Sequence, residues 1–404
     1  MGRKLAIIAI FLCSAAAWAI LGASIVARTG EAGTDLGPRV ASTWGAPQNQ
    51  TPPAASTKRT MRRPVENPAA GAPKSVAETI VEPLPIEQSR IRVALDLEQR
   101  QKGLLWFPTY RVAFHGDYLF RNTTPSDEVT IRLAFPVPEA IYDDLVLRVD
   151  GQPLPTTTMD GAVSTVVHRP PGSQIRVTTG YRSQGMKTWN YSFGEKVSQV
   201  HDFALEMRTN FAAIDFASGT LSPTEKKRAG AGWVLAWKYT NVVTGYGIGM
   251  VMPEKLQPGP LAGRISFFAP VSLLFFFFLM VVITAMRKID LHPMHYFFLA
   301  AAFFAFHLLL AYLADHISIH AAFAICSAVS IFLVVSYLRI VVNATFAWRE
   351  AALAQFVYLV LFSYAFFFQG FTGLAITIGA IISLFVAMQV TARVDWGKEG
   401  ARGT

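Results

Sequence analysis

Imidazole side chains are the groups in this sequence best suited to metal binding or proton transfer. Two clusters combine an aspartate with two histidines, and one histidine stands alone in an apolar run: Asp290, His292 and His295; Asp315, His316 and His320; and His307. The apolar helix between the two clusters separates them by about 30 Å, so they cannot form one metal site. Each cluster alone lacks further ligands. We interpret both as polar caps at the ends of a membrane helix, with metal binding as the less favoured alternative.

His307 differs because apolar residues surround it on both sides. A polar group inside a membrane helix is costly and normally points toward a partner within the bundle. The candidate partners on neighbouring segments are Tyr337, Tyr358, Ser363 and Tyr364. We interpret His307 as a packing residue with such a partner, and a proton relay or substrate contact is the alternative.

Enzyme motifs are missing from the sequence. It contains no GxSxG elbow, P-loop, HExxH or CxxC pattern. The glycines from Gly245 to Gly249 have the wrong spacing for a dinucleotide loop and indicate a glycine-rich strand or bulge. The two cysteines, Cys13 and Cys326, both lie within apolar runs. We therefore expect no catalysis, no cofactor and no metal site.

The composition indicates a membrane protein. Hydrophobic residues make up 52% of the chain and charged residues only 16%, which is more apolar surface than a soluble domain can bury. The formal net charge is +9, and much of it lies beside apolar runs. That position favours a role in membrane orientation over nucleic-acid binding.

Six apolar stretches approach the length of about 20 residues that a helix needs to cross a bilayer. They are residues 5–26, 266–286, 294–314, 321–341, 351–368 and 371–392. We therefore predict an N-terminal anchor at residues 1–30, a five-helix bundle at 264–392 and a tail at 393–404. A cleaved signal peptide is the alternative for the first stretch, because Ala17-Trp18-Ala19 resembles a cleavage site.

The orientation follows from the basic residues near the predicted spans. With the N-terminus in the cytoplasm, the inside segments hold nine lysines and arginines: Arg3, Lys4, Arg287, Lys288, Arg339, Arg349, Arg393, Lys398 and Arg402. The short outside turns, residues 315–320 and 369–370, hold none. This positive-inside bias predicts that both termini are cytoplasmic and that residues 27–263 are exported.

The exported region has two predicted parts. Residues 31–90 are rich in Pro, Ala, Gly, Thr and Ser, which is typical of a flexible tether. Within it, Lys58, Arg59, Arg62 and Arg63 form a charge run that we interpret as solvated, with anionic lipid contact as the alternative.

In the second part, residues 91–255, apolar and polar residues alternate, and turn signals such as Asp150-Gly151 separate the alternating runs. This pattern predicts half-buried antiparallel strands in a β-sandwich-like domain. The expected fold is thus an α+β membrane protein with six transmembrane helices, one N-terminal and five C-terminal, and one exported β domain.

Four fragments at the ends of predicted spans point to a family. They read Arg287-Lys-Ile-Asp-Leu-His-Pro-Met-His-Tyr296, Leu313-Ala-Asp-His-Ile317, Tyr337-Leu-Arg339 and Thr391-Ala-Arg-Val-Asp-Trp396. Together they resemble the CreD family of bacterial inner-membrane proteins, which shares this plan of spans. In the exported part, the segment from Arg100 to Tyr110 is similar to an early strand motif of that family. Asp315 stands where the family usually has Glu.

The positions that carry the resemblance, with His307 added as a candidate, are His292, Pro293, His307, Asp315, His316, Arg339, Arg393, Asp395 and Trp396. The resemblance implies a role in envelope integrity, with control by the CreBC two-component system and links to colicin tolerance and β-lactam response in relatives. It implies no catalytic activity.

We predict a multi-pass inner-membrane protein whose periplasmic domain binds or senses an envelope component or protein. Its expected partners are membrane lipids and that component, without nucleic acid; the pattern does not indicate an oligomeric state. A lipid or small-molecule transporter is the second hypothesis, and a metal-dependent membrane enzyme is the third.

Overall fold

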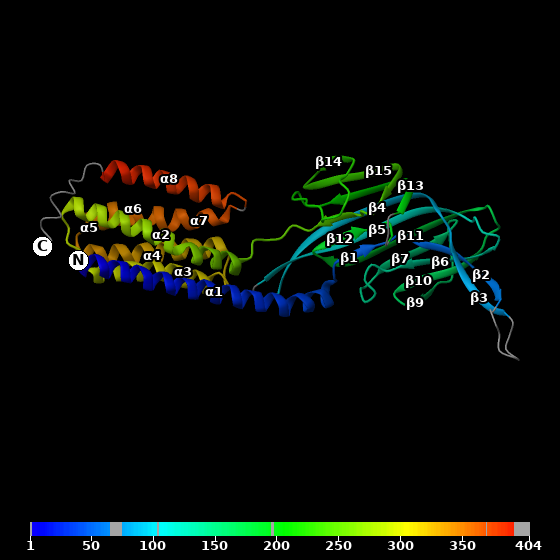
Figure 1. The fold of residues 1–404 in the computed structure, drawn as a ribbon, viewed down its shortest axis with the longest axis horizontal. Coiled ribbons are helices and arrows are strands. Elements are labelled where there is room, and N and C mark those ends of the chain that lie inside the picture. Colours follow the sequence, from blue (N-terminus) through cyan, green and yellow to red (C-terminus); the bar gives the residue numbers. More distant parts are fainter. Residues whose placement is uncertain (1, 65–74, 103–104, 195–197, 369, 392–404) are drawn as a thin grey trace. The chain divides into compact units, whose positions relative to one another are not determined.

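The structure is a computed structural model that describes residues 2–64, 75–102, 105–194, 198–368 and 370–391. It divides into two compact units. A helical unit comprises residues 1–35 and 256–404, and a β unit comprises Leu36–Lys255. Figure 1 shows the two groups of elements, and each unit is described on its own.

The helical unit contains most of the first helix and all the later ones. The first four long helices are α1 (Gly2–Trp44), α2 (Pro258–Arg287), α3 (Pro293–Leu313) and α4 (Ile319–Val341). A mixed helical stretch follows, made of α5 (Ala344–Phe346), η1 (Ala347–Ala351), α6 (Ala352–Gln355), η2 (Phe356–Leu361), α7 (Phe362–Tyr364) and η3 (Ala365–Phe367). The segments η1 and η2 are π-helical. The last described helix is α8 (Thr372–Thr391).

Five helical segments in the described residues are long and apolar enough to cross a membrane: Leu5–Trp44, Pro258–Arg287, Pro293–Leu313, Ile319–Val341 and Ala344–Phe367. They correspond to the first five predicted spans. The apolar stretch found in α8, Thr372–Val386, is shorter. The sixth span therefore stays a prediction.

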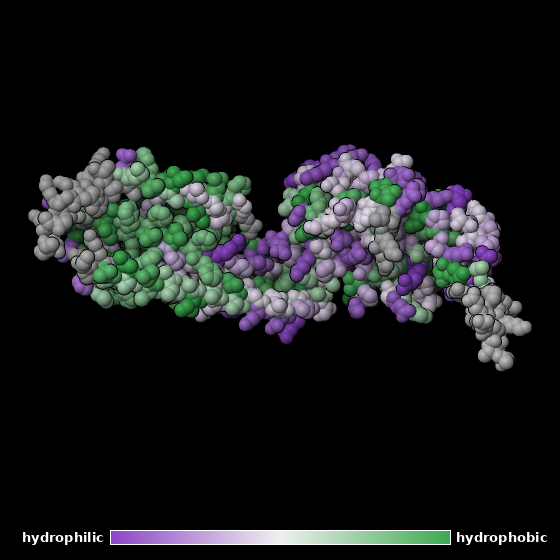
Figure 2. All heavy atoms as spheres, in the orientation of Figure 1, coloured by the Kyte–Doolittle hydropathy of each residue, from purple (hydrophilic) through white to green (hydrophobic). Residues whose placement is uncertain are grey.

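Large apolar side chains on the helical unit point outward as well as inward. Phe276, Phe303 and Phe306 are fully buried in its core, whereas Phe332 is 68% exposed and Ile340 is 80% exposed. The face of this unit seen in Figure 2 is accordingly mostly hydrophobic. Such an exterior suits a lipid environment, where exposed apolar groups carry no hydration penalty.

The described residues of the β unit form three sheets. The eight-stranded sheet has the order β14 (Glu225–Ala229), β15 (Gly232–Thr244), β13 (Ser198–Thr209), β4 (Ile86–Lys102), β5 (Leu105–Arg121), β11 (Gln174–Met186), β7 (Asp143–Val149) and β8 (Gln152–Pro153). The five-stranded sheet has the order β3 (Ser75–Pro83), β2 (Ala54–Pro64), β6 (Glu128–Ala134), β10 (Ala162–His168) and β9 (Thr157–Met159). The third has the order β1 (Gln48–Gln50), β12 (Thr188–Tyr191) and β16 (Ile248–Val251).

All three sheets contribute to one hydrophobic core. Ile131 of β6, Phe114 of β5 and Trp189 of β12 are at most 3% exposed and belong to the same buried cluster. The alternation found in the sequence therefore places one face of each sheet inward. The prediction of purely antiparallel pairing is wrong at two places, because β13 pairs with β4 and β1 pairs with β12 in parallel. Both pairs join segments distant in sequence, which a local pattern cannot orient.

The flexible tether predicted for residues 31–90 is wrong for the residues that the structure describes. Helix α1 continues to Trp44, β1 and β2 follow, and β4 begins at Ile86. The small and polar side chains that are typical of a tether do not prevent regular structure here. Small ones suffice in β2, because Ala55 and Thr57 are 2% and 1% exposed at the junction with β6.

Candidate functional site

The described residues of the segment that resembles a family motif, Arg100–Lys102 and Leu105–Tyr110, lie at the paired ends of β4 and β5, here called the β4–β5 hairpin. The two strands pair in antiparallel register from Glu98 opposite Thr109 to Lys102 opposite Leu105. This register places the charged side chains of β4 and the aromatic side chains of β5 side by side. The hairpin end is therefore a cluster of cations and aromatic rings.

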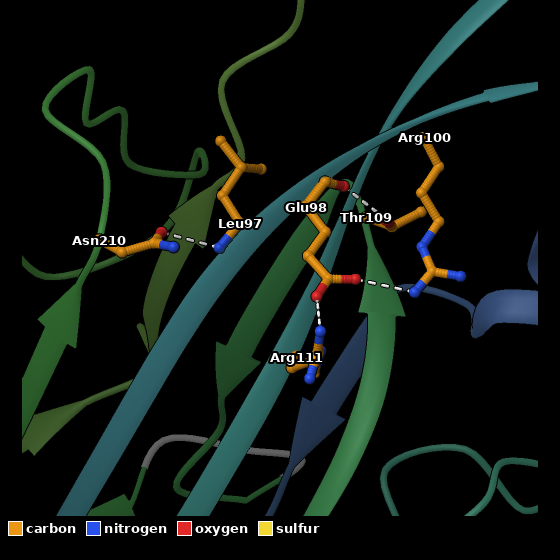
Figure 3. Close-up of polar contacts among 6 residues, drawn as sticks. All are labelled: Leu97, Glu98, Arg100, Thr109, Arg111 and Asn210. Carbon is orange, nitrogen blue, oxygen red and sulfur yellow. Dashed lines mark hydrogen bonds and ion pairs between the residues drawn. The ribbon is translucent and has the colours of Figure 1, made fainter.

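Glu98 is the centre of the polar contacts in this hairpin (Figure 3). Its carboxylate accepts a 2.7 Å hydrogen bond from Arg100 and a second one from Arg111, and both arginines form ion pairs with it. The hydroxyl of Thr109 donates to the Glu98 carbonyl at 2.6 Å. The hydrogen bonds from Arg100 and then Arg111 hold the pKa of Glu98 below its usual value, although partial burial acts in the opposite direction.

The end of α1 is held by the same hairpin. The guanidinium carbon of Arg100 lies 5.0 Å from the ring centre of Trp44, and the ammonium nitrogen of Lys102 lies 5.8 Å from it. Lys102 also donates to the carbonyl of Arg39 at 3.5 Å. Cations are favourable at the carboxyl end of a helix, where the backbone carbonyls are unpaired. Gly45 then turns the chain at a φ of 97°, and a Cβ there would collide with the carbonyl of Gln184.

The segment that leads to α2 meets the hairpin too. The amide of Gln99 donates to the carbonyl of Pro253 at 2.6 Å. The ammonium nitrogen of Lys255 lies 3.7 Å from the ring centre of Trp106. Lys255 is the last residue of the β unit. One hairpin thus contacts both chain segments through which the β unit is joined to the membrane helices.

In the helical unit, Asp315 pairs with a residue that the sequence analysis did not single out. The guanidinium of Arg28 on α1 lies 3.1 Å from the Asp315 carboxylate and donates to the carbonyl of Ala311 at 3.0 Å. The same guanidinium lies 5.5 Å from the ring centre of Tyr312. Arg28 therefore fastens α1 to the carboxyl end of α3. The sequence does contain one signal for this contact, which is a basic residue shortly after an apolar span.

The remaining predicted residues at this end do not form a metal site with Asp315. His316 is exposed, and the ring of His320 packs against Phe367 at 5.0 Å between centroids. Among the described residues, no group of three or more His, Cys, Asp or Glu side chains is arranged to hold a metal ion.

At the other end of α3, the histidines have separate structural contacts. His292 is the N-cap, and its Nδ1 accepts from the backbone N–H of Met294 at 3.3 Å, while Pro293 is the first helical residue. His295 makes a 2.7 Å hydrogen bond with the hydroxyl of Tyr337 on α4. Arg339 lies two residues further along α4. Arg393, Asp395 and Trp396 lie outside the described residues.

The partner predicted for His307 is wrong. Its Nδ1 hydrogen-bonds the carbonyl of Phe303 in its own helix at 2.9 Å. The imidazole ring packs edge-on against Trp18 of α1 at 5.5 Å between centroids. Nε2 of His307 and Nε1 of Trp18 are both buried without a hydrogen-bond partner in the described part of the chain. His307 therefore faces α1 and not the helices that carry the four predicted partners.

A buried polar chain that the sequence analysis missed crosses the bundle. The amide of Gln355 donates to the hydroxyl of Ser330 on α4 at 2.7 Å, and Ser330 donates to the carbonyl of Ala302 on α3 at 2.7 Å. Gln355 is fully buried. The hydroxyl of Ser272 on α2 donates to the carbonyl of Tyr358, within the π-helical η2. π-Helical turns alter the backbone ladder and often occur at functional sites.

Comparison with known proteins identifies a family. Residues 237–397 match the model of the family described as inner membrane protein CreD. This confirms the family predicted from the motifs at the span ends. No curated protein matches the chain.

Solved structures resemble the chain only distantly. A protein described as nutrient binding from Legionella pneumophila has 10% identity and a TM-score of 0.36, covering 57% of this chain and 76% of its own. An M1 zinc metallopeptidase from Deinococcus radiodurans has 9% identity and a TM-score of 0.29, covering 76% of this chain and 90% of its own. Similarity at this level carries no inference about function.

The first prediction concerns Arg28. We expect Arg28→Gln to lower the free energy of unfolding by about 1 kcal/mol, because a partly exposed ion pair and a cation–π contact are both lost. Thermal unfolding in detergent micelles measures the change. Arg339→Gln is the control, since Arg339 forms no ion pair with a described residue, and it should change stability by less than about 0.5 kcal/mol. Equal effects of the two variants would contradict the role of Arg28.

The second prediction concerns the pH dependence of Glu98. Its pKa is lower in the folded protein than in the unfolded chain, so its ionised form stabilises the fold at pH values above the ordinary glutamate pKa of 4.5. Glu98→Gln should therefore melt at a lower temperature than the wild type at pH 7. This difference should shrink as the pH falls below 4.5. The control is Glu206→Gln, because Glu206 pairs with Arg208 alone among the described residues. A difference for Glu98→Gln that does not shrink at all between pH 7 and pH 3 would argue against the hydrogen-bonded carboxylate.

Proposed function

We propose that this chain, which belongs with the CreD family of inner membrane proteins through residues 237–397, acts in cell-envelope integrity or the response to envelope stress. In this proposal the β unit lies in the periplasm and binds or senses an envelope component. The protein performs no catalysis.

The observation that carries the proposal is the β4–β5 hairpin. It touches Trp44 at the end of α1 and Lys255 ahead of α2. A change in the β unit that moves this hairpin therefore acts on both connections to the membrane helices at once. Such coupling suits a sensor, because a binding event must reach the membrane part through a physically continuous set of contacts.

Contacts within the helical unit support the further transmission of such a change from α1 to α3. Arg28 fastens α1 to the end of α3, and Trp18 packs against His307 further along the same two helices. A displacement of α1 would thus act on α3 at two places. In this proposal α1 is the element that transmits the signal.

The orientation is part of the proposal and is supported by the charge pattern. Nine lysines and arginines lie on the predicted inner side and none in the short predicted outer turns. With six spans, both termini are cytoplasmic and the β unit is periplasmic.

A transporter of lipids or small molecules is the alternative. The buried polar chain from Gln355 through Ser330 and the π-helical turns beside it favour this alternative, since polar groups inside a membrane bundle often mark a pathway. Movement of labelled lipid by the reconstituted protein would support transport over sensing.

The third prediction tests the orientation. Alkaline phosphatase, which is active only outside the cytoplasm, is fused after Ser192 in one chain and after Lys288 in another. We expect activity from the first fusion and none from the second, because the charge pattern exports the β unit and retains the α2–α3 turn. A green fluorescent protein fusion at each position serves as the control and should give the opposite pattern. Phosphatase activity only after Lys288 would overturn the proposed topology.

The fourth prediction tests the function in cells. Deleting the gene should increase sensitivity to detergent and alter the envelope-stress response, and the wild-type chain should restore both. Arg100→Ala should restore them poorly, because the hairpin loses its contacts with Glu98 and Trp44. Arg208→Ala removes an exposed ion pair of the same sheet and should restore them fully. An unchanged envelope phenotype in the deletion strain counts against the proposed function.

A further inference from the structure

The β2–β3 hairpin extends beyond the sheet to which it belongs. Strand β2 pairs with β6 only over Ala54–Thr57, whereas its pairing with β3 continues from Ser56 to Pro64. The residues from Lys58 to Met61 on β2 and from Thr79 to Glu82 on β3 are here called the arm. They form a two-stranded ribbon, which is at best marginally stable in water without a further packing surface.

Both faces of the arm combine a cation with an apolar side chain. Arg59 lies opposite Ile80, and Lys58 lies opposite Val81. Arg59 also forms a 3.9 Å ion pair with Glu82, but its side chain stays 51% exposed, so the pair leaves it open to solvent. Since facing residues on paired strands share one side of the ribbon, each face carries one such pair. Met61, Ile80 and Val81 are 44%, 38% and 58% exposed. Arg62 and Arg63 follow in the sequence of β2. This strand therefore has four cationic residues within the six positions 58–63.

The arm lies at the end of the β unit opposite the two membrane connections. Strand β5 begins at the hairpin that contacts Trp44 and Lys255, and it runs 17 residues, about 50 Å of strand, to Arg121. A short loop leads from there to the start of β6. Val129, near the start of β6, pairs with Thr57 of β2. Beyond Thr57, β2 continues as the arm. Figure 1 shows β2 and β3 extending from this edge of the β unit.

We propose that the arm binds an anionic phospholipid surface other than the membrane crossed by the chain's own helices. This inference rests on the proposed function, since it names the envelope component that the β unit contacts. Interleaved cations and apolar side chains suit such a surface, because the cations attract the lipid phosphates and the apolar groups enter the headgroup region. The position of the arm, far from the connecting segments, selects an opposing membrane.

A second exposed basic strand among the described residues of the β unit has a different environment. In β14, Lys226 and Arg228 lie over the ring of Trp233, at 4.2 and 5.0 Å from its centre. These cations already have an aromatic partner, and charged side chains on an edge strand prevent unwanted pairing. That explanation does not fit the arm, where Ile80 and Val81 are exposed beside the cations. Strand β14 therefore provides a matched control.

The test uses the full chain in nanodiscs of neutral phosphatidylcholine, mixed with separate vesicles. One vesicle set is pure phosphatidylcholine and the other contains phosphatidylglycerol as well. We expect at least roughly tenfold more protein to float with the anionic vesicles. Lys58→Glu with Arg59→Glu should reduce flotation to the neutral level, whereas Lys226→Glu with Lys227→Glu should leave it unchanged. Val81→Ser with Met61→Ser should weaken flotation several-fold even in high salt, which screens charge but not apolar contact.

Equal flotation with neutral and anionic vesicles, or an equal loss for the arm and β14 variants, would overturn the proposal. Circular dichroism of each variant shows that the β unit is intact, and Lys58→Gln with Arg59→Gln provides a milder change if the reversed charges disturb the fold. The deletion phenotype separates this inference from the proposed function. If the arm variants restore the deletion strain fully and anionic vesicles do not bind, the arm proposal fails while the envelope role stands.

Discussion

The β unit is inserted into a chain of membrane helices, so both of its ends must lead back to the membrane. This constraint explains why the two ends of the unit meet at one hairpin. Trp44 stacks under the cations of β4, and Trp106 on the facing strand lies under Lys255. A cation–π contact at an exposed site contributes roughly 0.5–1 kcal/mol. The hairpin therefore holds both connections through several contacts that are each weak.

The helical unit obeys a second constraint, the lack of water in the hydrocarbon core. Its buried polar groups must find partners in the protein, and some of them do so between helices. Ser330 links α3 to the helix that carries Gln355, and Ser272 links α2 to the carbonyl of Tyr358. Some buried polar atoms of the described residues nevertheless have no hydrogen-bond partner, among them Oε1 of Gln355, Nε2 of His307 and Nε1 of Trp18. His307 and Trp18 are in contact with each other. That pair marks the junction of α1 and α3 as a poorly satisfied part of the bundle.

Much of the helical unit could be predicted from sequence, because hydrocarbon length and charge asymmetry are local properties. The contacts between helices could not, since an apolar segment with polar groups on several sides does not reveal which side faces which neighbour. His307 illustrates this limit: the four expected partners were all on later helices, and the true neighbour is Trp18 on the first. The error at residues 31–90 has another cause. Small side chains such as Ala55 are typical of a flexible tether, but Ala55 is 2% exposed because β2 pairs with β6 at the edge of the hydrophobic core.

The ion pair between Arg28 and Asp315 lies where this chain departs from the family that it resembles, since the resemblance places Glu where this chain has Asp315. The long side chain of Arg28 reaches from α1 to the end of α3 and also donates to the carbonyl of Ala311, so its position does not depend on the carboxylate alone. The Arg28 side chain is 40% exposed, and an ion pair exposed to that degree contributes only modestly to stability. The contact between α1 and the end of α3 therefore rests on several weak interactions of one guanidinium, with the carboxylate, the Ala311 carbonyl and the ring of Tyr312.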